Sequence, residues 1–155
     1  MKFTLRMAAT FATALSFTAM STPVLAHSDD PHPDTLKATQ GGQLGVAGVF
    51  SYELVIDKNA KEGADSAVVV YVTDHAGKKV QTAGASGTAT ILAGKLKASA
   101  VLKPDGDNRM KGNANYAASP NMKVLVSITL AGKPPEQTRF TPLSVAKDGH
   151  TDHQH

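Results

Sequence analysis

Short apolar segments with a two-residue period, separated by turn-forming clusters, fill residues 41–143 of this chain. Residues 123–130 have an apolar side chain at every second position from Val124 to Leu130, and residues 66–73 are rich in β-branched side chains. Both segments are too short for a typical helix, and their period places the apolar side chains on one face of a strand. No convincing amphipathic helix pattern accompanies them. The pattern therefore predicts an all-β domain.

Seven or eight short strands are expected in all, because the remaining apolar runs are equally short and are bounded by Gly, Pro, Asn and Asp. Each such strand buries one face, so the predicted fold is an immunoglobulin-like β-sandwich, with a small barrel as the alternative. The other expected strands are residues 43–46, 52–56, 88–92, 96–102, 109–116 and 137–140. The expected turns are residues 74–77, 93–95, 104–108, 119–121 and 131–133.

The first 26 residues have the layout of a secretory signal peptide. Lys2 and Arg6 precede a short apolar run at residues 7–20, and Pro23 with small residues precedes Ala26. That run is too short to anchor the chain in a bilayer, and no later stretch is long enough to cross one. We therefore expect export, cleavage after Ala26 and no membrane insertion of the mature chain, which would begin at His27.

The mature chain divides into a polar leader at residues 27–40, a strand domain at residues 41–143 and a polar tail at residues 144–155. The leader and the tail are expected to be flexible, because both are poor in apolar side chains. The chain contains no cysteine, so an exported form would depend on a hydrophobic core without disulfides. A seven-strand sandwich tends to place its two ends at opposite poles, which favours two separate polar tails.

Charge gives no reason to expect a nucleic-acid partner. The formal charge of +3 includes Lys2 and Arg6, which leave with the signal peptide. The sequence has no basic stripe, and its aromatic content of 5% is too low for a base-stacking platform.

The leader carries a candidate metal site. A free amine and an imidazole on His27 could chelate one ion, and His32 could complete the set. Nitrogen ligands of this kind suit Cu(II) best, followed by Ni(II) and Zn(II). The alternative is a solubilising leader in which His27 merely follows the cleavage site.

The C-terminal tail carries a second candidate site. It places His150, His153 and His155 close together with Asp152, and short His-rich tracts are metal-binding compositions. Without a rigid set of supporting contacts such a site would bind loosely and with modest selectivity. The alternative is a solubilising tail with incidental histidines.

Other chemistry-bearing residues have simpler explanations. His75 lies in a turn and is expected to be solvated, and Met110 and Met122 are expected to pack in the core. Residues 105–108 are similar to the start of a calcium loop, but the twelfth position is Tyr116, where a bidentate Glu is needed. No catalytic arrangement is evident, so we expect a protein that is not an enzyme.

Five strings of the strand domain are informative together: YELV at 52–55, VYVTDHAGK at 70–78, GASGTAT at 84–90, GDNR at 106–109 and RF at 139–140. They resemble a small periplasmic β-domain that occurs in exported proteins and in N-terminal modules of adaptor subunits of heavy-metal efflux systems. The resemblance spans about residues 41–140 and implies a Gram-negative periplasm and an efflux adaptor as partner. Those relatives often begin the domain with His-Gly-Gly, where this chain has Gln40-Gly41-Gly42. A mature start at His27 is also similar to a copper-carrier sandwich family.

The sequence thus predicts a periplasmic, non-enzymatic protein that binds or buffers a divalent transition metal through its His-rich tails. The alternative is a structural β-module that docks by a sheet edge onto an envelope or efflux-adaptor partner without a physiological metal.

Overall fold

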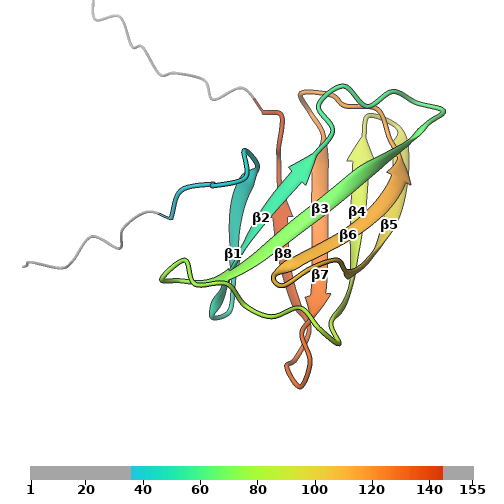
Figure 1. Ribbon diagram of the computed structural model, residues 1–155. Coiled ribbons are helices and arrows are strands. Elements are labelled where there is room, and N and C mark those ends of the chain that lie inside the picture. Colours follow the sequence, from blue (N-terminus) through green and yellow to red (C-terminus); the bar gives the residue numbers. More distant parts are fainter. Residues whose placement is uncertain (1–35, 145–155) are drawn as a thin grey trace, which may run out of the picture. The chain divides into compact units, whose positions relative to one another are not determined.

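Eight antiparallel strands make up the domain in the computed structural model, which describes residues 36–144 (Figure 1). No helix occurs within that range, and so none there could span a membrane. The strands are β1 (Gln43–Ala47), β2 (Phe50–Ile56), β3 (Asp65–Asp74), β4 (Ser86–Ala93), β5 (Leu96–Pro104), β6 (Arg109–Asn115), β7 (Lys123–Thr129) and β8 (Glu136–Phe140).

The strands form one sheet in the order β1-β2-β3-β6-β5-β4-β7-β8. Strands β4, β5 and β6 follow one another, and β7 returns to lie beside β4, which is the Greek-key arrangement. The sheet has two halves, because β5 pairs with β4 along its length but with β6 only at Lys103 and Pro104. We call β1-β2-β3-β6 the first half and β5-β4-β7-β8 the second half.

The core lies between the two halves and follows the alternation of the sequence. In the first half, Tyr52, Leu54 and Ile56 of β2 face inward with their cross-strand partners on β3. In the second half, Val124, Val126 and Ile128 of β7 are each 1% exposed. Met110 and Met122 are fully buried, which confirms that both pack in the core. Burial of apolar side chains from β2 to β8 between the two halves is therefore what stabilises the fold.

Side chains draw the two edge strands, β1 and β8, together. The amide N–H of Thr141 donates to Gln43 Oε1 at 2.8 Å, and Gly45 leaves the space that Thr138 and Phe140 occupy. A Cβ on Gly45 would lie 2.5 Å from Thr138 Oγ1, so only glycine allows this approach. The sheet is consequently nearly closed, as Figure 1 shows.

The prediction of an all-β fold with seven or eight strands is confirmed. The strands belong to one nearly closed sheet, a barrel-like arrangement. The first and last strands lie side by side at their outer ends, because the amide N–H of Thr141 just after β8 donates to Gln43 at the start of β1. The sheet has an even number of antiparallel strands, so β1 and β8 run in opposite directions. Because the sheet nearly closes, the start of β1 and the end of β8 lie close together.

Candidate functional site

The metal ligands predicted from the sequence all lie outside the described residues 36–144. They are His27, His32, His150, Asp152, His153 and His155. Within the described part of the chain, no group of three or more His, Asp or Glu side chains could hold a metal ion. The two tail sites remain predictions.

His75 is the one histidine of the described range, and it lies in the turn after β3. Its side chain is exposed. The neighbouring Asp74 is committed to the turn, since its Oδ1 accepts the amide N–H groups of Ala76 and Lys78, both at 2.9 Å. Gly77 has φ of +78°, which completes the turn. Exposure and turn geometry confirm the expectation of a solvated turn histidine.

Residues 36–42, which we call the covering segment, fold back over the outer face of the first half. This segment is fixed by Glu53, whose side chain points outward from β2 but is only 5% exposed. Glu53 Oε1 accepts the amide N–H of Gln40 at 2.7 Å and of Gly42 at 2.9 Å, and Oε2 accepts that of Thr39 at 2.9 Å. A buried carboxylate is stable where donors surround it in this way.

Gly42 shows how closely the covering segment approaches the sheet. A Cβ on Gly42 would lie 2.2 Å from the carbonyl oxygen of Leu54, so a larger residue would push the segment off β2. The end of the predicted leader is therefore held against the domain by hydrogen bonds from the amide N–H groups of Thr39 and Gln40 to the Glu53 side chain.

A pocket of about 270 Å³ lies between the covering segment and the end of β3. Leu36 and Gly77 both line it, and a Cβ on Gly77 would be 3.4 Å from Leu36 Cδ2. The covering segment thus begins beside the turn that carries His75. The pocket is lined by Leu36, Lys37, Thr39, Gln40, Leu44, Glu53, Tyr71, Thr73, Gly77, Lys79 and Asn108.

Glu53 cannot act as a general base in this pocket without breaking the covering segment. Its two oxygens already accept three amide N–H groups, and Thr39 Oγ1 adds a fourth contact at 3.4 Å. The hydrogen-bond partners of the Glu53 side chain are Thr39, Gln40 and Gly42, all of the covering segment. The pocket is best described as the seat of the covering segment.

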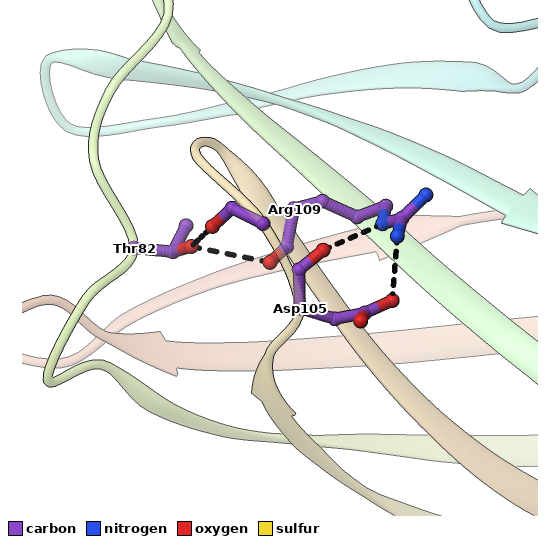
Figure 2. A network of polar contacts seen from close by, with 4 residues as sticks. Thr82, Asp105 and Arg109 are labelled. Carbon is purple, nitrogen blue, oxygen red and sulfur yellow. Dashed lines mark hydrogen bonds and ion pairs between the residues drawn. The ribbon is translucent and has the colours of Figure 1, made fainter.

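A second polar network fixes the loop between β3 and β4, as Figure 2 shows. The fully buried Thr82 donates its hydroxyl toward carbonyl oxygens of the β5–β6 turn, the shortest contact being 3.1 Å to Arg109 O. Arg109 Nε donates to Asp105 O at 2.7 Å, and its guanidinium pairs with the Asp105 carboxylate at 2.9 Å. Asp105 is therefore used to hold a tight turn, in agreement with the sequence argument against a calcium loop.

Sequence reasoning missed the role of Glu53. Its one signal is a lone acid inside the apolar string Tyr52-Glu53-Leu54-Val55. Such a residue on a half-buried strand is normally solvated, and only the return of the covering segment buries it.

Comparisons with protein-family models, with curated proteins and with solved structures find no match for this chain. The candidate sites must therefore be argued from their own chemistry.

Proposed function

We propose that this chain is an exported, non-enzymatic protein of a Gram-negative periplasm that binds or buffers divalent transition metal through its His-rich tails. Its role would be accessory to heavy-metal efflux or resistance. The observation that carries the proposal is the placement of histidine: five of the six lie at residues 27–32 and 150–155, beside acidic residues, and only His75 lies in the strand domain. Short tracts of this composition are suited to Cu(II), Ni(II) and Zn(II).

The paths of the described chain support two separate sites. The covering segment begins at Leu36, beside the turn that follows β3. At the other end of the chain, Ser144 shares a groove with Gly94 of the turn that follows β4. Strands β3 and β4 run in opposite directions, since three antiparallel pairings separate them in the sheet. The two polar segments therefore start from opposite ends of the domain, although β1 and β8 are neighbours.

Metal binding at either tail should weaken as pH falls. An α-amine has a pKa of about 7.7 and an unperturbed imidazole about 6.5, and both must lose a proton to bind metal. The leader site would then fail at higher pH than the tail site, because only the leader site uses the amine.

Calorimetric titration of the chain that starts at His27 with Cu(II), Ni(II) and Zn(II) tests this proposal. We expect one Cu(II) equivalent to be lost on deleting residues 147–155, and another on adding one residue before His27, which blocks the amine. His75→Ala is the matched control, since it removes one imidazole from the strand domain and should leave both sites intact. Equal, weak binding by all four proteins would refute the proposal.

A second candidate function is an interaction module that docks by a sheet edge onto an efflux adaptor or another envelope protein, without metal. The observation that favours it is that β1 and β8, although side chains draw them together, share no backbone pairing among the described residues. A partner strand would have to insert between these two strands. Unpaired strand edges can accept a strand from a partner.

We also propose to class the domain as an immunoglobulin-like sandwich. What supports this finer classification is the short ladder between the halves, where β5 and β6 pair only at Lys103 with Lys111 and at Pro104 with Met110. A junction of that kind separates two packed layers rather than continuing one smooth sheet.

A further inference from the structure

The outer face of the second half is cationic. Four basic side chains, Lys97, Lys103, Lys123 and Arg139, occupy exposed positions of β5, β7 and β8. The one acidic residue of these four strands, Glu136, turns away from this face, because its Oε2 accepts the hydroxyl of Tyr52 at 2.7 Å. The face thus carries positive charge with no carboxylate among its outward side chains.

Three of the four cations surround a groove with an apolar floor. Leu92 of β4 lies opposite both Lys97 on β5 and Lys123 on β7, so the two lysines flank it. Arg139 of β8 lies opposite Leu125 of β7 in the next row. The groove measures about 640 Å³ and is lined by Thr90, Leu92, Lys97, Lys123, Val124, Leu125, Arg139, Phe140 and Thr141.

The cations of this groove have no partner within residues 36–144. The ion pair formed in that range joins Arg109 to Asp105, on the β5–β6 turn. Leu92 remains 45% exposed between its two lysines. Apolar surface rimmed by charges of one sign is typical of a surface that meets a partner of opposite charge.

We propose that this groove docks an extended acidic segment of a partner protein. Strand β4 lies between Lys97 and Lys123, so two inter-strand spacings separate their backbones by about 10 Å. An extended segment places side chains of one face at alternate residues, about 7 Å apart. A segment with acid, apolar and acid side chains at alternate positions therefore matches the row Lys97, Leu92, Lys123, within the reach of the flexible lysine side chains.

A protein segment fits this groove better than a nucleic acid does. Leu92 and Leu125 supply outward-facing apolar side chains of the groove, and its one aromatic lining residue, Phe140, is only 2% exposed and offers no ring on which a base could stack. Leucine between two cations instead offers a contact for an apolar side chain of a peptide.

The test is fluorescence anisotropy of a labelled nine-residue peptide with glutamate, leucine and glutamate at alternate positions, added to the full chain at low ionic strength. We expect saturable binding that weakens with salt, because charge pairs at an interface rim are screened. The double variant Lys97→Glu/Lys123→Glu should weaken it about tenfold or more. The matched control Lys58→Glu/Lys61→Glu changes the net charge equally at two exposed lysines outside the groove and should change affinity less than about twofold.

Equal losses in both variants would overturn the proposal, as would failure of the peptide to bind. Tighter binding of an oligodeoxynucleotide or of phosphatidylglycerol vesicles to the same variant-sensitive surface would also overturn it, in favour of a nucleic acid or a lipid headgroup. Thermal unfolding of each variant checks its fold. Arg139→Gln, a single neutral change, provides a second variant whose expected loss is smaller but in the same direction.

Discussion

The two halves of the sheet both bury their inner faces in one core, but their outer faces differ in how far they are covered by other parts of the chain. The first half is covered over β2, because residues 36–42 return across this strand and bury Glu53 under three amide N–H groups. The second half is open, and its outer face exposes lysine and arginine around Leu92 and Leu125. The comparison teaches that burial on the outer face of a sheet depends on where the chain returns, and that alternation within the strands does not determine it.

The difference also separates structural from functional charge. Glu53 of the first half is satisfied internally and holds the covering segment, whereas the cations of the second half have no partner among the described residues. Charges that are unpaired and exposed are available to a partner, while a buried and fully bonded carboxylate is not.

The largest effect should come from breaking the junction between the halves. A Cβ on Gly112 of β6 would lie 2.3 Å from the carbonyl oxygen of Val101 on β5. Because two backbones meet there, Gly112→Ala should lower the free energy of unfolding by about 3 kcal/mol in urea denaturation. The exposed neighbour Asn113→Ala is the control and should change it by less than about 0.5 kcal/mol. A neutral Gly112→Ala would show that the halves are not held this closely.

Removing the anchor of the covered half should have the next largest effect. Glu53→Ala leaves the amides of Thr39, Gln40 and Gly42 without their acceptor. We expect a loss of about 2 kcal/mol in unfolding free energy and faster amide exchange at residues 39–42. The exposed Glu62→Ala is the matched control. If both variants are equally stable, the covering segment is not held by Glu53.

Tyr52 of β2 tests the contact between the first half and β8 of the second half, because its hydroxyl donates to Glu136. Burial, reinforced by the Glu136 carboxylate, raises the pKa of Tyr52. A raised pKa means that this hydroxyl contributes stability below its unfolded pKa of about 10, and that the contribution is lost as pH rises further. Tyr52→Phe should cost about 1 kcal/mol at neutral pH and flatten the alkaline decline, measured by urea unfolding at several pH values. If the unfolding free energy of Tyr52→Phe falls at alkaline pH as steeply as that of the unmodified protein, the contact between Tyr52 and Glu136 is not the cause of that fall.

The smallest effect is expected on the open face. Lys97→Ala and Lys123→Ala together should change the unfolding free energy by less than about 0.5 kcal/mol, because neither lysine has a partner within the described range. Thermal unfolding measures this change. A large loss would mean that the open face is structural, and the comparison between the halves would then fail.

Much of the strand domain could be predicted from the sequence, because a period of two reports directly which side chains face the core. Val124, Val126 and Ile128 were predicted to share one face, and they are buried together. Closure of the sheet could not be predicted in this way, since it depends on Gly45 meeting Thr138 and Phe140 from the far end of the chain.

The groove and the buried position of Glu53 were harder to predict than the core, because both depend on residues that are far apart in the sequence. Lys97, Lys123 and Arg139 are far apart in sequence, and only the pairing of β5, β4, β7 and β8 brings them around one groove. The burial of Glu53 likewise depends on a long-range return of the backbone. The histidine tails show the reverse situation: their composition is evident in the sequence, and their metal chemistry is still a prediction.

Residue-by-residue broadening of backbone amide NMR signals by Cu(II) tests the central claim most directly. In the chain that starts at His27, the account expects one equivalent or less to broaden signals of residues 27–36 and 145–155 first, with the core strands β2, β3, β4 and β7 unaffected. Broadening that begins in the core strands or on the cationic face of the second half, or no broadening at all, would contradict the assignment of metal binding to the tails.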